Sequence, residues 1–336
     1  LLDPDFDQAY VAIGQKIRKF RFRSCQPSLY PILDKLIAAG KYVRPSNVAK
    51  AVLSLLSHDP LLRRLLAQPD EIEGAESFQV AVRGISRFPL LHTLMKSCAI
   101  PDLRFEALFS RMRRVALVHL SELEPSRELL DFLSALAMHC FTNDYLYPER
   151  DDEAALVAEL QETVCSPIDG SEAADLAALL CLATYRPIHQ LLQASALTAL
   201  DTVPELRQRI FAEPLIERAL TTEIPSLGVI TDATSIKVRK QYENNPYPRW
   251  VRACVRADPV AADAVFKQSA LKFRSGCPLN LANPEILIAG CGTGQHAIES
   301  AATWRGSKVL AVDISLARLS YAQRKTNELN QENIDF

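Results

Sequence analysis

The sequence predicts a mostly helical protein whose last part is the first half of an α/β unit. Two observations carry this prediction. Glycine, which weakens helices, occurs only 11 times in 336 residues, and four of the 11 lie between residues 290 and 306. Apolar residues make up 48% of the chain and recur at helical spacing through most of it, whereas strand-like runs are confined to its end. From these patterns we expect four segments, which are residues 1–25, 26–230, 231–278 and 279–336.

The first segment, residues 1–25, resembles the end of a tetratricopeptide repeat. The residues that fit this 34-residue pattern are Pro4, Tyr10, Ile13 and Gly14. The match covers less than one repeat and fails at Gln26, where a small residue is expected. An ordinary amphipathic helix is the alternative. If the repeat is real, we expect further repeats before Leu1 and a protein partner bound through the repeat or helical region.

Residues 26–230 are predicted to form a helical domain. Apolar positions recur at helical spacing in a series of segments, and the breaks between them carry Pro, Asp or Gly. These segments are 44–57, 61–67, 78–85, 90–98, 105–120, 129–141, 153–164, 173–185, 188–197 and 204–220. His139 and Cys140 stand close to several acids, but adjacent residues on a helix point about 100° apart and do not share an ion easily. We therefore expect a helix end there, and no metal.

Residues 231–278 are predicted to contain a linker and a preliminary helix, the helix over 259–273. The interval 236–274 holds nine Lys or Arg against three acids, and its first part is rich in aromatic residues and prolines. The hypothesis is that three of its aromatic residues form a lid or brace over the mouth of a binding site, stiffened by the neighbouring prolines. These residues are Tyr242, Tyr247 and Trp250. The alternative is a linker whose aromatics pack on the helical domain.

The segment that points to a chemistry begins at residue 285. Residues 286–289 form a continuous apolar run, which is typical of a parallel strand buried on both faces. Three glycines then stand at alternate positions, and a helix-compatible segment follows over 295–304. The glycines are Gly290, Gly292 and Gly294. A strand, a glycine loop and a helix form the frame of a nucleotide-type site, where bare backbone approaches the ligand and the helix start favours negative charge.

A second strand strengthens this interpretation. Residues 308–312 are strand-like and end on Asp313, about 20 residues after the glycine loop, where a carboxylate accepts hydrogen bonds from ribose hydroxyls. We therefore predict a Rossmann-like unit over 279–336. An ordinary α/β unit whose glycines only make a tight turn is the alternative.

Here the chain resembles a class I S-adenosylmethionine-dependent methyltransferase of the bacterial type that carries tetratricopeptide repeats. The resemblance rests on residues 286–294, 309–315 and 316–329. It implies that the glycine loop lies against the methionine half of S-adenosyl-L-methionine and that Asp313 holds the ribose. The residues expected at the cofactor are Gly290, Cys291, Gly292, Gly294, Gln295, Asp313 and Ile314. Ile288 stands where family members usually have an acid that helps to hold the cofactor's amino group.

The resemblance implies methyl transfer to a nucleophilic N, O, S or C atom of an unidentified acceptor. Such enzymes work mainly by holding the nucleophile in line with the methyl group. Gln295 stands where the dinucleotide-binding pattern has glycine, which argues against NAD. Residues 333–336 resemble the start of a third strand, so we expect a fragment, inactive alone, whose catalytic residues lie beyond Phe336. The alternative function is a helical scaffold with a vestigial nucleotide-binding unit.

Composition narrows the remaining possibilities. A net charge of −2 implies no general attraction to nucleic acid, although the basic interval 236–274 leaves an RNA or acidic-protein acceptor open. No apolar run approaches the ~20 residues of a membrane span. The eight cysteines form no CxxC pair and are expected to be buried free thiols in the cytoplasm. Cys291 is expected to be a small filler, and His296 a helix-start residue rather than a general base.

Overall fold

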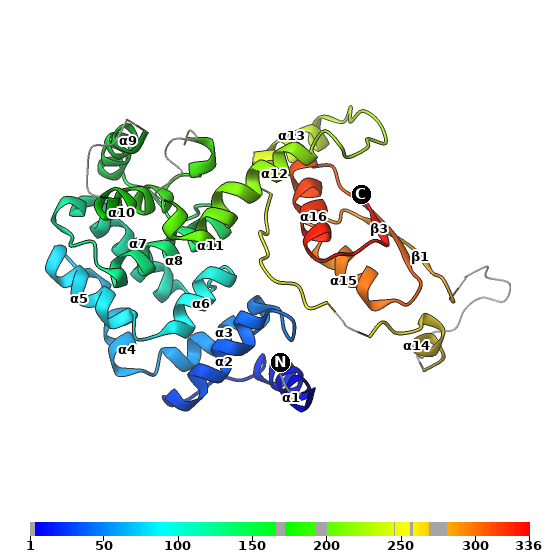
Figure 1. The fold of residues 1–336 in the computed structure, drawn as a ribbon, viewed down its shortest axis with the longest axis horizontal. Coiled ribbons are helices and arrows are strands. Elements are labelled where there is room, and N and C mark those ends of the chain that lie inside the picture. The colour runs from blue at the N-terminus through cyan, green and yellow to red at the C-terminus, as the bar shows by residue number, and fades with distance from the viewer. Residues whose placement is uncertain (1–3, 166–171, 192–199, 245, 256–257, 269–280) are drawn as a thin grey trace. The chain divides into compact units, whose positions relative to one another are not determined.

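The structure is a computed structural model that describes residues 4–336 except 166–171, 192–199, 245, 256–257 and 269–280 (Figure 1). The chain groups into two compact units, which meet in sequence between Ala212 and Glu213. The described residues are mostly helical, and a small parallel sheet of three strands lies in the second unit. The expectation of a mostly helical chain is therefore confirmed.

The first unit is built from helices. They are α1 (Pro4–Ile17), α2 (Tyr30–Ala39), α3 (Pro45–Leu56), α4 (Pro60–Ala67), α5 (Ala75–Ile85), α6 (Pro89–Ser97), α7 (Leu103–Val118), α8 (Arg127–Thr142), α9 (Asp151–Cys165), α10 (Glu172–Ala183) and α11 (Pro204–Arg207). Most of the predicted helical segments are confirmed. The exception is 188–197, where residues 188–190 form a 3₁₀ turn and residues 192–197 lie outside the described part.

Sequence signals explain where several of these helices begin. Prolines occupy the first turn of α3, α4 and α6, where the missing N–H costs no helical hydrogen bond. Asp59 and Asp102 accept hydrogen bonds from the first backbone N–H groups of α4 and α7, and Ser126 does so for α8.

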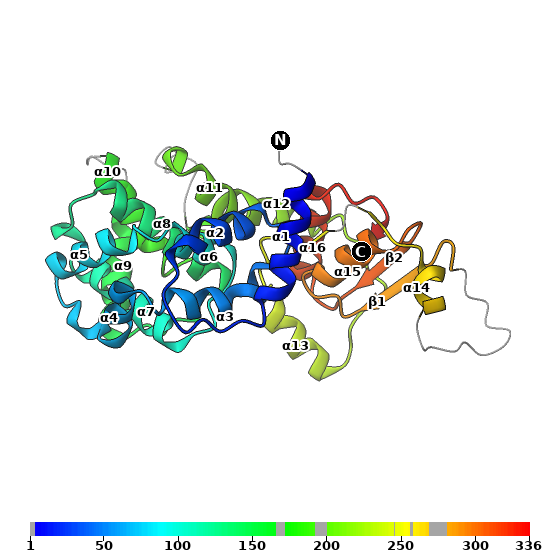
Figure 2. The same cartoon turned by 90° about the horizontal axis from the view of Figure 1, so that it is seen from below.

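Helix α8 is buried along most of its length and packs against α6 and α10, beside which it is drawn in Figures 1 and 2. His139 of this helix is 1% exposed, and its Nε2 lies 2.8 Å from the hydroxyl of Tyr147. Among the described residues, no group of three or more His, Cys, Asp or Glu side chains is arranged to hold a metal ion. His139 is thus a buried residue of the helical core.

The burial of His139 predicts an acid-sensitive helical unit. Desolvation lowers the pKa of His139 from 6.5 to about 4 in the folded chain. Between these two pH values the unfolded chain binds a proton that the folded chain does not. The contribution of neutral His139 to the unfolding free energy is therefore complete above about pH 6.5 and is lost as the pH falls toward 4. We expect this one group to remove up to about 1.4 kcal/mol per pH unit. Urea unfolding followed by far-UV circular dichroism from pH 7 to pH 4 measures the slope. The His139→Gln variant should show a slope smaller by about one proton, and an unchanged slope would contradict the assignment.

Helix α1 approaches the rest of its unit closely. Tyr10 stacks on Tyr42 with ring centroids 5.3 Å apart, and a Cβ added to Gly14 would lie 3.0 Å from Cβ of Val43. Tyr10 and Gly14 therefore have packing roles within this unit. Membership of α1 in a tetratricopeptide repeat stays a prediction.

The second unit contains the three strands and five helices of the described chain. In order they are α12 (Glu213–Leu220), α13 (Ala233–Asn244), α14 (Ala262–Gln268), β1 (Glu285–Ala289), α15 (Gln295–Thr303), β2 (Lys308–Val312), α16 (Leu316–Glu328) and β3 (Ile334–Asp335). The strands are parallel in the order β1-β2-β3, with Ala289 beside Val312 and Leu310 beside Asp335. The predicted strands and the helices of residues 295–304 and 316–329 are confirmed. Of the helix expected over 259–273, α14 is described, and residues 269–273 lie outside the described part.

Only one face of the sheet is packed by described residues. Val309 and Ala311 are buried in a core that also contains Ile298 of α15 and Leu319 of α16. On the opposite face, the side chain of Leu287 is 65% exposed and that of Leu310 is 46% exposed. Of the two faces that a strand of this kind buries, only one is covered in the described chain, because both covering helices lie on the same side.

Helix α12 belongs to the second unit, although the predicted helical domain extended to residue 230. Its Glu217 carboxylate lies 2.8 Å from Nε of Arg324 in α16, and Glu213 lies 3.0 Å from another guanidinium nitrogen of Arg324. All three side chains are at most 16% exposed. Helix α12 lies within the predicted segment 204–220, whereas α13 was not predicted, because residues 233–244 show weak apolar periodicity.

The described cysteines are free thiols. Cys98, Cys140 and Cys181 are buried as expected, whereas Cys165 is exposed at the end of α9. In the part of the chain that the structure describes, no helix combines the length and the apolar character needed to cross a bilayer.

Candidate functional site

The glycine loop is fixed at the carboxyl end of β1 by backbone hydrogen bonds. The N–H groups of Gly290 and Cys291 both donate to the carbonyl of Val312, at 2.8 and 3.0 Å. Gly290, Gly292 and Gly294 have φ values of +74°, +58° and +77°, a region that L-residues with side chains rarely adopt. The loop therefore requires glycine at all three positions, and it lies over the end of β2.

The three glycines have different surroundings. A Cβ added at Gly290 or Gly292 would meet no atom within 4 Å, so open space faces these two residues. A Cβ on Gly294 would lie 2.4 Å from Cβ of Ala322 in α16. Gly290 and Gly292 thus leave room for a ligand, whereas Gly294 permits the close approach of α16 to the start of α15.

Asp313 holds the turn between β2 and α16. Its Oδ2 accepts the N–H of Gly292 at 2.8 Å, and its Oδ1 accepts the N–H of Ser315 at 3.0 Å. An ionised carboxylate has about four acceptor positions, so about two remain for ligand hydroxyls. The acid predicted from the sequence is therefore tied directly to the glycine loop.

The start of α16 is capped from two places. Ser315 accepts the backbone N–H of Arg318, as an N-cap serine does. Glu243, which is 73 residues away in α13, accepts the N–H groups of Leu316 and Ala317 at 2.7 and 3.2 Å. This carboxylate satisfies free amides at the positive end of the helix dipole and docks α13 onto α16.

Residues 248–251 are hydrogen-bonded to the glycine loop and to α16. Indole Nε1 of Trp250 donates to the carbonyl of Thr293 at 2.9 Å, and the hydroxyl of Thr293 donates to the carbonyl of Pro248 at 2.8 Å. The hydroxyl of Tyr321 donates to the carbonyl of Trp250, and Lys325 donates to the carbonyl of Val251 at 3.0 Å. Trp250 is 8% exposed, and its ring packs edge-on against that of Tyr321. Trp250 thus connects the glycine loop to α16 and is buried between them.

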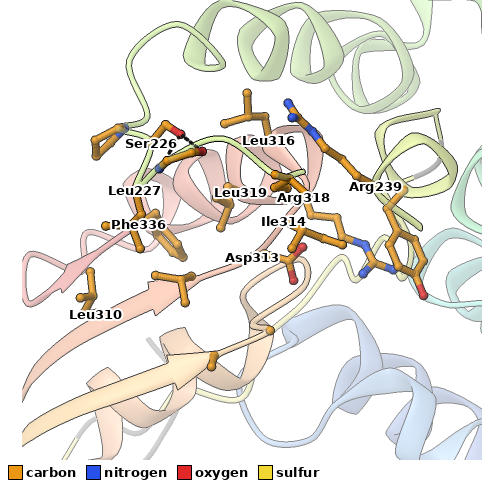
Figure 3. A pocket seen from close by; sticks show the side chains of 17 residues that line it. Ser226, Leu227, Arg239, Leu310, Asp313, Ile314, Leu316, Arg318, Leu319 and Phe336 are labelled. Atoms are coloured by element: carbon orange, nitrogen blue, oxygen red, sulfur yellow. Dashed lines mark hydrogen bonds between the residues drawn. The ribbon is translucent and has the colours of Figure 1, made fainter. Parts of the chain in front are cut away.

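A cavity of about 690 Å³ opens at the carboxyl ends of β1 and β2 (Figure 3). Its volume lies within the range of about 300 to 1,000 Å³ that is usual for small-molecule sites. One part is apolar, with Leu310, Leu319 and Phe336, and the segment of residues 225–230 passes over it. Asp313 and Arg318 line the polar part. Such a cavity suits a ligand with one apolar and one polar portion.

The predicted site residues divide into two groups. Those that line the cavity are Gly290, Asp313, Ile314 and Tyr242. Those placed outside its lining are Cys291, Gly292, Gly294, Gln295, Tyr247 and Trp250. Gly292 and Gly294 shape the loop, and the amide of Gln295 makes a long contact of 3.4 Å to the carbonyl of Arg252. The Tyr247 side chain is 44% exposed and not part of the cavity wall.

Two candidate reactive groups lack the surroundings for chemistry. Burial, and to a smaller extent the nearby charge of Asp313, raises the pKa of the Cys291 thiol to about 12. This thiol therefore stays protonated at neutral pH. Cys291 packs as a small, half-buried residue beside the second unit's core. His296 is exposed and does not line the cavity.

Sequence reasoning missed two residues of this site. Arg318 lies three positions after the N-cap of α16, and its guanidinium carbon stacks 3.2 Å from the ring centroid of Tyr242. Glu243 was overlooked within the basic interval. The concentration of aromatics and cations before the glycine loop was the available signal. It did not reveal which of them meet α16.

The basic interval carries less free charge than its composition suggests. Arg239 lies 3.5 Å from Glu243, Arg249 lies 3.7 Å from Glu217, and Lys267 lies 3.2 Å from Asp263. Internal pairing thus offsets part of the excess of cations between residues 236 and 274.

Comparison of the chain with protein-family models, with curated proteins and with solved structures found no match. The geometry of this cavity is therefore the basis for inferring a function. That geometry consists of an open glycine loop, a carboxylate with spare acceptor positions and an apolar wall.

Proposed function

We propose that the second unit binds S-adenosyl-L-methionine and that the protein transfers its methyl group to an acceptor. The observation that carries this proposal is the bond from the Gly292 amide to Asp313, which joins the glycine loop and the acid into one binding surface. The parallel strand order β1-β2-β3, with the loop after β1 and the acid after β2, supports a Rossmann-like half.

The residues present fit the cofactor. Open space at Gly290 and Gly292 lets the amino-acid portion of the cofactor lie against the backbone of the glycine loop. Asp313 offers acceptor positions to the ribose hydroxyls. Ile314, which is 38% exposed, and Phe336 supply apolar surface for an adenine ring. When bound, the cofactor supplies an electrophilic methyl group. The residues of this chain bind and orient it.

Other features agree with an enzyme of the cytoplasm. The described cysteines are unpaired, which suits a reducing compartment. The high pKa of Cys291 argues against its use as a covalent nucleophile, so direct transfer to a bound acceptor is the simpler reaction. Catalysis then consists mainly of holding the acceptor atom in line with the methyl group.

Titration with S-adenosylhomocysteine tests the proposal. Trp250 contacts the glycine loop, and Trp304 is the only other tryptophan in the sequence, so the Trp304→Phe variant makes fluorescence a local reporter of the loop. We expect saturable binding, detected both by this signal and by calorimetry, and no competition by NAD. If neither method detects binding of S-adenosylhomocysteine, the scaffold function takes the place of this proposal.

A further inference from the structure

The guanidinium of Arg318 lines the cavity without an ion-pair partner among the described residues. Within the described chain its Nε is also buried without a hydrogen-bond partner. The other arginine that lines the cavity, Arg239, is paired with Glu243. A buried donor without a partner costs about 1 to 3 kcal/mol, so a ligand that supplies an acceptor gains from it.

Tyr242 holds this guanidinium in place. The two groups stack at 3.2 Å, and the phenol ring comes from α13, which Glu243 docks onto the start of α16. Stacking occupies the face of the guanidinium and leaves the N–H groups at its edge available. Because the side chain is already ordered, little conformational entropy is lost when it binds an anion.

Arg318 lines the same cavity as Asp313. Figure 3 shows its side chain extending past Asp313, and its guanidinium lies over the ring of Tyr242. All three residues line the cavity together with Gly290. Its positive charge is close enough to the loop to oppose, weakly, the rise in the pKa of Cys291 that burial causes. A ligand whose hydroxyls meet Asp313 and which continues toward Gly290 therefore occupies the cavity that Arg318 lines.

We propose that Arg318 binds the α-carboxylate of the ligand's amino-acid portion, in a geometry preset by its stack on Tyr242. This inference rests on the proposed function. A guanidinium matches a carboxylate with two parallel hydrogen bonds, and such charge-assisted pairs are stronger than neutral ones. Ile288 offers no carboxylate to the ligand's amino group, so the anionic end of the amino-acid portion is the end that this chain recognises.

Two ligands that differ by one carboxylate test the assignment. S-adenosylhomocysteine carries the α-carboxylate, and its decarboxylated analogue keeps the nucleoside, the thioether and the amine. In the Arg318→Gln variant we expect the affinity for S-adenosylhomocysteine to fall about 10- to 100-fold, while the affinity for the analogue changes less than about threefold. Arg318→Lys keeps the charge without the planar fork and should restore part of the difference.

The matched control is Lys308→Gln, which also removes one positive charge. Lys308 is exposed at the start of β2, the end of the strand opposite the cavity, and both affinities should keep their wild-type values. An equal loss of both ligands in Arg318→Gln, or no loss of either, would overturn the role of Arg318. If the wild-type chain binds neither ligand, the proposed function itself fails, which is a different outcome. Thermal unfolding of each variant, followed by tryptophan fluorescence, shows whether it is folded.

Discussion

The Gly294→Ala variant is expected to lower the unfolding free energy of the second unit by about 2 to 5 kcal/mol. Two independent costs add at this position. The backbone has φ +77°, which costs a residue with a Cβ about 1 to 2 kcal/mol. The added Cβ would also lie 2.4 Å from Cβ and 3.2 Å from Cα of Ala322, and overpacking of this kind costs about 1 to 3 kcal/mol. The nearest atoms belong to a helix rather than to a flexible side chain, so they yield little.

Two further variants separate these costs. Gly290→Ala has a similar φ of +74° but meets no atom within 4 Å, so it should show only the backbone part, about 1 to 2 kcal/mol. Adding Ala322→Gly to Gly294→Ala removes the closest contact and should recover part of the loss. Denaturant unfolding followed by tryptophan fluorescence measures all of them, because both tryptophans lie in the second unit. Equal losses in Gly294→Ala and Gly290→Ala would contradict the close approach of α16.

The local parts of this unit were predictable because their signals are local. Apolar runs of four residues and glycines at alternate positions each act within a few residues of chain, and the structure has β1, β2 and α15 where these signals place them. Asp313 was predictable for the same reason, because it directly follows a strand. Periodicity did not reveal that the first strand is covered on one face only, since Leu287 and Ile288 are equally apolar and differ only in what lies above them.

The parts that were not predictable depend on contacts between residues distant in sequence. Glu243 caps a helix that begins 73 residues later, and Tyr242 stacks on an arginine of that same helix. Neither contact leaves a pattern in the local sequence, and α13 has too little apolar periodicity to be recognised before its partner is known. The role of Trp250 was ambiguous in the same way. Its indole N–H donates to the carbonyl of Thr293, which lies 43 residues further along the chain, and the local sequence does not indicate this partner.

The Asp313→Asn variant is expected to have the largest effect on ligand binding. In the folded chain both carboxylate oxygens accept backbone N–H groups, from Gly292 and from Ser315. An asparagine amide has one oxygen and one NH₂ group, so in either orientation the NH₂ group faces a backbone N–H, and one of the two bonds is lost. The ligand also loses a charged acceptor for its hydroxyls, worth about 1.5 to 3 kcal/mol for each bond.

We therefore expect the affinity of Asp313→Asn for S-adenosylhomocysteine to fall about 100-fold or more, with a loss of about 1 to 3 kcal/mol in unfolding free energy. Asp263→Asn is the matched control, because Asp263 lies on α14, pairs with Lys267 and is not part of the cavity wall. Calorimetric titration measures binding, and tryptophan fluorescence measures stability. A decarboxylated ligand should lose affinity in Asp313→Asn as strongly as S-adenosylhomocysteine does, since Asp313 is assigned to the nucleoside, whereas Arg318→Gln should discriminate between the two ligands. Discrimination by Asp313→Asn would place the carboxylate of the ligand beside Asp313, which is opposite to the orientation that the glycine loop and Arg318 support.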